Sequence, residues 1–294
     1  MDCSSEILKS VFSKTAWLLS LALVCHENAF GQQPDVPLER MLTEPAEVFG
    51  EGDDEIETDR DSFTPATTVV GRGRLIVESS YSFLDNRSGA ETHSFPELLT
   101  RIGVSENIEF RLGWNYEIGG GGSVSNAGSP TEEELPDDGR EEEGSLLYGL
   151  KVSLTEQDGW LPQSALIVQA NTPTAGPVNA TQFTTGYVFG WTLPNDWTID
   201  SSLRYAASSE EGDHFNLWAP SVVLKVPVHE QWKAHIEYFG IFSDNRETDE
   251  ASQYISPGIH YLMTPDFEVG LRVGWGLSDD SARFFSNVGA GLRF

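Results

Sequence analysis

The segment from Ile108 to Ile118 has the sequence IEFRLGWNYEI, in which large apolar residues alternate with charged, polar or glycine residues at every step. Successive side chains of a β-strand point to opposite faces of a sheet, so this alternation predicts a strand with one apolar and one polar face. The same period continues to the end of the chain, where residues 284–294 have the sequence FFSNVGAGLRF. The period predicts an all-β protein, and both a soluble sandwich and a membrane barrel satisfy it.

The arrangement of the strand-like segments favours the barrel. From about Arg72 onward there are about twelve of them, each near the roughly 9–11 residues that a tilted membrane strand needs. We place them at 73–84, 94–104, 108–118, 144–155, 163–171, 182–193, 197–207, 215–227, 232–242, 253–263, 267–277 and 284–294. Short turns such as Ser105-Glu106-Asn107 alternate with long polar loops such as 119–143. This asymmetry is typical of outer-membrane proteins, so we predict an antiparallel transmembrane β-barrel of about 12 strands.

The polar faces of these strands mix charges of both signs with glycines. Glycine weakens a strand, but inside a crowded barrel it makes room for long side chains. We therefore expect the apolar faces to meet lipid and the polar faces to line the lumen. The basic residues predicted there are Arg74, Arg101, Arg111, Lys151, Arg204, Lys225, Lys233, Arg272 and Arg293, and the acidic ones are Glu78, Glu97, Glu109, Glu117, Asp200, Glu237 and Glu268. They either brace the barrel as ion pairs or form a path for a solute.

The overall charge comes from other parts of the chain. There are 46 Asp and Glu against 18 Lys and Arg in 294 residues, a formal net charge of -28. This balance excludes a basic nucleic-acid-binding surface. Acidic residues and prolines are concentrated in 32–71, where no strand period is present, so we expect an extended acidic periplasmic arm there and the barrel at 72–294.

The first 31 residues have the pattern of an export signal. Lys9 and Lys14 precede a short apolar core at 16–24, and Ala29-Phe30-Gly31 places small residues where a signal peptidase cleaves. We expect a cleaved signal peptide at 1–31, with a lipoprotein signal that uses Cys25 as the alternative. Both cysteines lie in this presequence, so the mature chain would have no disulfide.

The sequence has no recognisable catalytic or metal-binding pattern. The five histidines after residue 31 have no partner at metal-ligand spacing: His93, His214, His229, His235 and His260. No nucleophile elbow or phosphate-binding loop is present. We therefore expect no catalytic residue, no metal and no cofactor, and a lipid-hydrolysing barrel enzyme with a Ser/His pair ranks third among the functions considered.

Four stretches at the junction of arm and barrel resemble a known family. They are ETDRDSFT at 57–64, GRGRLIVE at 71–78, FPELLTRIGV at 95–104 and NIEFRL at 107–112. They resemble the outer-membrane β-barrel family named for the meta-pathway of phenol degradation, and the resemblance covers about residues 57–294. At Asp61 the chain departs from the family, which typically has proline there.

This resemblance implies a transporter-like barrel that passes small, often aromatic, compounds across the outer membrane. By match it carries over six positions, namely Asp59, Arg60, Glu97, Arg101, Glu109 and Arg111. We interpret them as a charge cluster inside the barrel near the periplasmic mouth, where the arm could dock. The pore-lining or arm-docking set is completed by Lys151, Arg204, Lys233, Glu237, Glu268 and Arg272.

We accordingly predict an outer-membrane channel or uptake porin of a diderm bacterium for small solutes, hydrophobic or aromatic ones among them. Its expected partners are outer-membrane lipid, lipopolysaccharide and the solute, without nucleic acid. The alternative is a structural or binding barrel whose acidic loops bridge divalent cations, lipopolysaccharide or another partner. A lumen of about twelve strands is narrow, so side chains should largely fill it and conductance should be small.

Overall fold

The computed structural model describes residues 55–87, 89–120, 141–176, 180–210, 213–245 and 251–294. They belong to the second of two units in the chain, Gly52–Phe294. The expected signal peptide, most of the expected arm and most of the loop at 119–143 lie outside the described residues.

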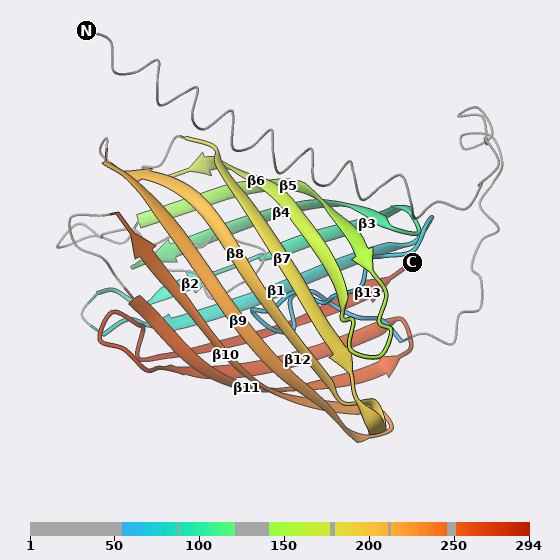
Figure 1. Cartoon of the computed structure of the whole chain (residues 1–294). Coiled ribbons are helices and arrows are strands. Elements are labelled where there is room, and N and C mark those ends of the chain that lie inside the picture. Colours follow the sequence, from blue (N-terminus) through green and yellow to red (C-terminus); the bar gives the residue numbers. More distant parts are fainter. Residues whose placement is uncertain (1–54, 88, 121–140, 177–179, 211–212, 246–250) are drawn as a thin grey trace, which may run out of the picture. The chain divides into compact units, whose positions relative to one another are not determined.

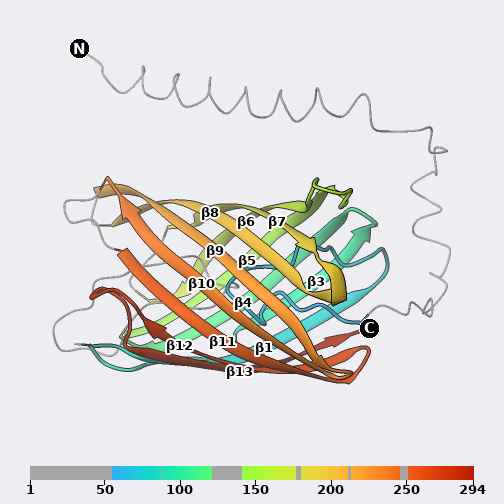
Figure 2. The same cartoon turned by 60° about the horizontal axis from the view of Figure 1, so that its bottom comes forward.

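The described part of the chain contains thirteen strands in one antiparallel sheet that closes on itself (Figures 1 and 2). The strands are β1 (Leu75–Asp85), β2 (Thr92–Ser94), β3 (Leu98–Ser105), β4 (Ile108–Gly119), β5 (Glu141–Thr155), β6 (Gln163–Ala175), β7 (Gln182–Thr192), β8 (Thr198–Glu210), β9 (Asp213–His229), β10 (Trp232–Asp244), β11 (Ala251–Thr264), β12 (Phe267–Gly276) and β13 (Phe284–Arg293). Closure comes from β13, which pairs with β1 from Ile76↔Arg293 to Asp85↔Phe284. The predicted antiparallel barrel is confirmed.

The barrel wall has twelve strands because β2 and β3 are two parts of one. Both pair with β1 on one side and with β4 on the other. The interruption at Phe95-Pro96-Glu97 follows from Pro96, which has no N–H to donate to a ladder. Its neighbours still bond to the adjacent strands, since Phe95 N donates to Tyr116 O at 2.8 Å and Glu97 N donates to Ser80 O at 3.0 Å.

The two ends of the barrel differ in their connections. At one end, here called the turn end, short segments join β3 to β4, β7 to β8, β9 to β10 and β11 to β12. In the turn at Pro194–Asp196, Asn195 has φ 67° and Asp196 φ 58°, a left-handed conformation that Asn and Asp tolerate best after glycine. The opposite end is called the loop end. There β8 extends to Glu210 and β9 begins at Asp213, so both strands are longer than the predicted 197–207 and 215–227.

Side-chain burial along each strand follows the predicted alternation. In β4, Leu112 and Trp114 are exposed on the outside, while Glu109 and Arg111 are buried inside. Burial of charge and exposure of large apolar groups reverse the pattern of a water-soluble protein and suit a barrel surrounded by lipid. No helix in the described ranges is long and apolar enough to cross a membrane.

Candidate functional site in the barrel lumen

Residues 55–71, here called the lumenal segment, lie inside the barrel as a loop that begins and ends at the turn end (blue in Figure 2). At its start, Ile56 N donates to Pro265 O at 2.7 Å in the turn between β11 and β12. Just after its end, Gly73 N donates to Gly103 O at 3.0 Å on β3. Every residue from Thr58 to Thr67 is buried. The segment therefore fills part of the lumen and returns to the end at which it entered.

A cluster of buried charges surrounds the carboxylate of Asp59. It is ion-paired with Arg111, lies 3.2 Å from Lys151 Nζ and lies 3.6 Å from Arg101 Nη1. Register brings these partners together, because Arg101 pairs with Arg111 and Glu109 pairs with Lys151 on neighbouring strands. Burial raises the pKa of the Asp59 carboxyl, but Arg101, Lys151 and Arg111 outweigh it and hold that pKa well below its usual range. Asp59 is therefore ionised when docked.

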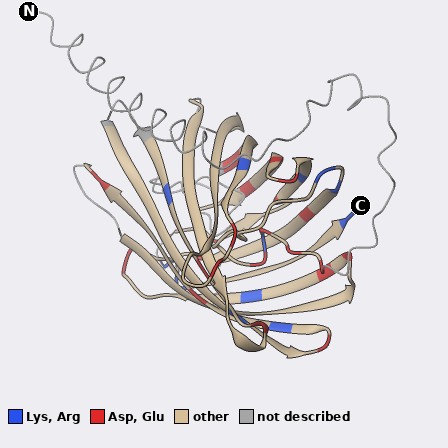
Figure 3. Ribbon diagram, turned by 45° about the vertical axis from the view of Figure 1, so that its right-hand side comes forward, with Lys and Arg blue, Asp and Glu red and all other residues tan. Residues whose placement is uncertain are grey.

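Three carboxylates of the barrel wall hold the backbone of the lumenal segment. Glu78 Oε2 accepts from Asp59 N and Arg60 N, both at 3.0 Å. Glu237 accepts from Phe63 N at 2.9 Å and Thr64 N at 2.7 Å, and Glu109 Oε2 accepts from Val70 N at 2.9 Å. Buried N–H groups need partners, and charged acceptors make the stronger bonds. The wall thus replaces the backbone partners that a sheet would have supplied. Figure 3 shows both signs of charge on this segment and on the strands around it.

The tip of the lumenal segment is aromatic. The Phe63 ring stacks on Phe239 with centroids 4.2 Å apart, and Arg204 Cζ lies 3.8 Å from the Phe63 centroid. The tip belongs to an apolar lumenal cluster, which consists of Phe63 and, from the barrel, Leu84, Ala206, Phe215, Leu217, Ala219, Phe239, Ile241, Tyr254, Ala282 and Phe285. These wall residues lie mainly toward the loop end of β1, β8–β11 and β13. One side of the lumen is therefore apolar, which the prediction that the polar strand faces line the lumen did not include.

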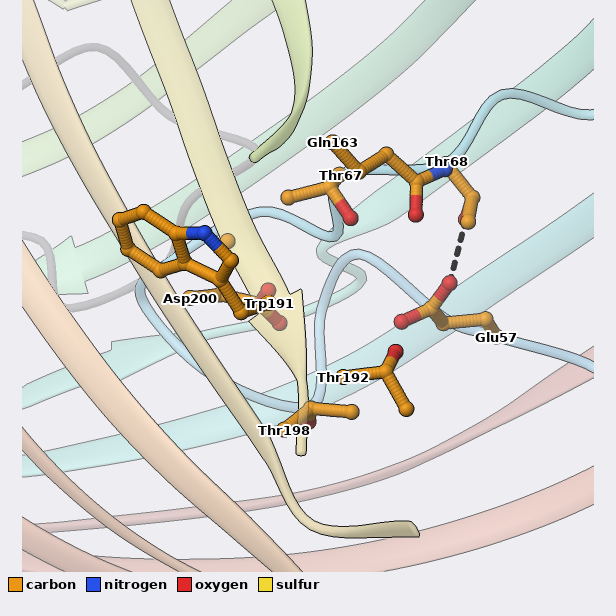
Figure 4. A pocket seen from close by; sticks show the side chains of 9 residues that line it. Glu57, Thr67, Thr68, Gln163, Trp191, Thr192, Thr198 and Asp200 are labelled. Atoms are coloured by element: carbon orange, nitrogen blue, oxygen red, sulfur yellow. Dashed lines mark hydrogen bonds between the residues drawn. The ribbon is translucent and has the colours of Figure 1, made fainter. Parts of the chain in front are cut away.

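A small cavity of about 80 Å³ lies between the lumenal segment and strands β6–β8. It is lined by Glu57, Thr67, Thr68, Gln163, Gly190, Trp191, Thr192, Thr198 and Asp200 (Figure 4). The Thr68 hydroxyl donates to Glu57, as Figure 4 shows. Asp200 occupies the space over Gly190, where a Cβ would lie 2.0 Å from its Oδ1. The cavity is polar and lies beside the segment.

Potential metal ligands also meet in the lumen. One donor atom from each of Asp61, His260 and Glu268 lies within 4.8 Å of the other two. Sequence spacing did not reveal this group, because its members come from the lumenal segment, β11 and β12.

A family model described as "Putative MetA-pathway of phenol degradation" matches residues 58–294. The chain belongs to this family. The match begins within the lumenal segment, so the region that defines the phenol-degradation family includes the docked segment as well as the barrel. The resemblance found in the sequence is thereby confirmed. No curated protein sequence matches the chain.

Solved structures with a similar fold are outer-membrane barrels. An outer membrane channel from Pseudomonas putida F1 matches with TM-score 0.55 and 12% identity, over 81% of this chain and 100% of that one. The NanC porin matches with TM-score 0.48 and 11% identity, over 74% and 98%. The translocator domain of the autotransporter NalP from Neisseria meningitidis matches with TM-score 0.48 and 12% identity, over 75% and 88%. At 12% identity, the likeness to the Pseudomonas putida F1 channel shows the fold alone.

The residues carried over from the phenol-degradation family do not form one cluster. Asp59, Arg101, Glu109 and Arg111 are together, but Arg60 points away and its Nη2 donates to Asn287 Oδ1 at 3.0 Å. Glu97 lies beside Asn287, whose Nδ2 donates to it at 2.9 Å.

The other predicted site residues are distributed along the lumenal segment. Lys151 joins the Asp59 cluster, Arg204 lies at the tip, and Glu237 lies 3.4 Å from Arg272 Nη1. Two more lie near the turn end. Glu268 accepts from the Thr58 hydroxyl at 2.9 Å, and Lys233 Nζ lies 2.6 Å from Glu55 in a half-exposed pair.

Several residues that contact the lumenal segment or belong to it were not in the predicted site. Lys225 Nζ lies 3.0 Å from Asp61 Oδ2, and Glu78 and Phe63 make the backbone and ring contacts described above. Strand parity had already placed Glu78 and Lys225 in the lumen. No strand pattern could place Phe63 or Asp61, because the lumenal segment pairs with no strand.

Proposed function

We propose that the protein is an outer-membrane channel for small solutes, in which the lumenal segment closes the lumen until it is displaced. The observation that carries the proposal is the way this segment is held. Asp59 and Thr64 contact the wall through ion pairs and hydrogen bonds, and Phe63 through a backbone hydrogen bond, ring contacts and apolar packing. Such contacts are reversible. A buried ion pair adds little stability over apolar packing of the same volume. Apolar side chains would therefore fill the lumen equally well, and the buried charges indicate a role other than filling.

The proposed solutes are small molecules with an apolar or aromatic part. The apolar lumenal cluster supports this choice, because Phe239, Tyr254 and Phe285 present rings within 6 Å of one another inside the barrel. Aromatic rings favour stacked or edge-to-face contacts at such distances. Displacement of Phe63 from Phe239 would leave a ring-sized site against the cluster. Membership of the phenol-degradation family agrees with an aromatic solute.

The proposal includes the placement of the chain. Residues 1–31 are removed as a signal peptide, 32–71 begin on the periplasmic side, and 72–294 form the barrel in the outer membrane. The outer membrane channel from Pseudomonas putida F1, whose fold this barrel shares, supports that location. N-terminal sequencing of the mature protein from membranes tests the cleavage at Gly31, and retention of residues 1–31 would contradict it.

Solute uptake by liposomes tests the channel. The purified mature chain is compared with the double variant Arg101→Ala/Arg111→Ala, which removes two of the cations around Asp59. We expect little uptake with the natural chain and several-fold faster uptake of a small aromatic acid with the variant. The matched control is Arg72→Ala/Arg283→Ala, which removes the same charge at exposed positions and should behave like the natural chain. Unboiled and boiled gel migration establishes that each variant is a folded barrel. Equal uptake by folded natural chain and variant would disprove the closure of the lumen by the segment.

A further inference from the structure

The lumen contains a second group of polar side chains, separate from the Asp59 cluster. His260 on β11 and Glu268 on β12 face inward two residues apart, since His260 pairs with Gly270 and Leu262 pairs with Glu268. Asp61 on the lumenal segment faces them. The three donor atoms lie within 4.8 Å of one another, and all three residues are buried. The group therefore spans the contact between the segment and the wall.

One ring nitrogen of His260 has no hydrogen-bond partner. Its Nε2 lies 2.6 Å from His235 Nδ1, which accounts for that nitrogen. Its Nδ1 is buried and unpartnered, and Glu268 Oε1 is 3.8 Å away, too far for a hydrogen bond. A buried polar atom without a hydrogen-bond partner is costly, so this nitrogen is available to a ligand. An imidazole nitrogen facing two carboxylates is the arrangement that binds a metal ion.

The wall is shaped to hold this imidazole. A Cβ at Gly270 would lie 2.8 Å from His260 Nδ1, and a Cβ at Gly258 would lie 2.6 Å from His235 Nε2. Any larger residue at either position would displace a histidine. The two rings stack with centroids 4.8 Å apart, so His235 fixes the orientation of His260. A second residue that orients a histidine ligand through its other nitrogen is usual at metal sites.

The two carboxylates also contact neighbouring groups but keep oxygens that could bind a metal ion. Lys225 Nζ lies 3.0 Å from Asp61 Oδ2, and the Thr58 hydroxyl donates to Glu268 Oε1 at 2.9 Å. Each carboxylate has a second oxygen, and that of Asp61, Oδ1, accepts from the Ser62 hydroxyl at 3.3 Å. The charge of Lys225 opposes a cation, so the site should bind more weakly and more reversibly than a structural zinc site.

We propose that Asp61, His260 and Glu268 bind one divalent transition-metal ion of the Zn²⁺ class, which joins the lumenal segment to the barrel wall. One imidazole and two carboxylates are ligands of this class, with bonds of about 2.0–2.2 Å and water in the remaining position. Bonds of that length hold ligands about 3.5 Å apart in a tetrahedron, so the group must contract by about 1 Å. Asp61 lies on the lumenal segment, outside the strands, and can supply this contraction.

Metal binding by the whole mature chain in detergent tests the site. After removal of metal with EDTA, Zn²⁺ is titrated by calorimetry and Co²⁺ by visible absorption, each as the chloride salt. We expect one saturable site per chain. Asp61→Asn, His260→Gln and Glu268→Gln should each weaken binding at least ten-fold. His229→Gln, which changes a histidine at the end of β9 outside the group, should bind like the natural chain.

Asp61→Asn keeps the test decisive if the wall variants fail to fold, because Asp61 lies on no strand. Natural binding by folded Asp61→Asn, or no saturable Zn²⁺ site in the natural chain, would overturn the proposal. Hydrogen exchange provides a second measurement. Zn²⁺ should slow exchange in peptides from 55–71 of the natural chain and should not change exchange in the same peptides of Asp61→Asn. Equal exchange with and without Zn²⁺ would overturn the link between segment and wall. Neither measurement involves solute flux, so the metal site and the channel function are tested independently.

Discussion

Asp59 on the lumenal segment and Arg111 on β4 form an ion pair in which both side chains are almost completely buried. They are 52 residues apart in the chain and meet inside the barrel, where Arg101 and Lys151 add two more positive charges. The acid comes from the segment and the cations come from the wall. This division of charge ties the docking of the segment to the barrel interior.

Replacement of Asp59 by Asn should release the lumenal segment. The change leaves Arg101, Arg111 and Lys151 buried with one negative charge fewer among them, and removal of one partner of a buried ion pair typically costs about 3–5 kcal/mol. Hydrogen exchange of peptides from 55–71, measured by mass spectrometry, should be much faster in the folded variant than in the natural chain.

Asp266→Asn is the matched control for this prediction. Asp266 is also ion-paired, with Arg293 Nε at 2.7 Å, but it is more than half exposed at the turn end. Exposed pairs contribute about 0–1 kcal/mol, so exchange in 55–71 should change little. An equal effect of the two substitutions would show that burial of the Asp59 cluster does not hold the segment.

Phe63→Ala should loosen the tip of the segment and raise solute uptake. The substitution removes the stack on Phe239 and the contact with the Arg204 guanidinium, and Phe→Ala changes at buried sites cost about 3–5 kcal/mol. Liposome uptake of a small aromatic solute should rise several-fold.

Phe63→Leu keeps most of the apolar volume and should raise uptake much less. Phe95→Ala, at an exposed position between β2 and β3, should leave uptake unchanged. Uptake by Phe63→Ala no faster than by Phe95→Ala would argue against the tip as the closing element.

The barrel was predictable from the sequence because lipid outside and polar groups inside impose a two-residue period on each strand. That period holds well in β4 and β12, where alternate residues face the two environments. It fails toward the loop end of β10, where Tyr238-Phe239 and Ile241-Phe242 place large apolar residues on both faces. Those consecutive apolar pairs were the available signal for the apolar lumenal cluster.

The path of the lumenal segment was not predictable from local sequence. It forms no strand, and its contacts are with residues far along the chain, such as Thr64 with Glu237 at a separation of 173 residues. Charge complementarity can suggest that an acidic stretch meets a basic lumen, but not which carboxylate meets which cation. The motif-based hypothesis of arm docking at Asp59, Arg101 and Arg111 remains a prediction about function.

Lys225→Met should strengthen metal binding at the proposed site. Lys225 places a positive charge 3.0 Å from Asp61 Oδ2, and removal of that charge favours a cation there. At an effective dielectric constant near 20, a charge several ångströms away contributes a few kcal/mol, so Zn²⁺ affinity should rise about ten-fold or more. Lys233→Met changes a half-exposed lysine and should have a smaller effect because solvent screens its charge. Calorimetric titration distinguishes the two, and weaker Zn²⁺ binding by folded Lys225→Met would contradict the assignment of Asp61 as a ligand.

Gly103→Ala should displace the end of the lumenal segment where it leaves the barrel. A Cβ at position 103 would lie 1.9 Å from Gly71 O and 2.5 Å from Val70 O, and both are backbone atoms that cannot rotate away. The segment must move or β3 must bend, at a cost of about 1–3 kcal/mol. We expect faster hydrogen exchange in peptides from 55–71 and faster solute uptake, with the barrel still heat-modifiable on gels. Gly71→Ala is the matched control on the other side of the same contact, because its Cβ would meet only the Glu106 side chain at 3.6 Å and the Arg74 side chain at 4.0 Å. If Gly103→Ala and Gly71→Ala had equal exchange and uptake, the close approach of β3 to Gly71 would not be what holds the segment end in place.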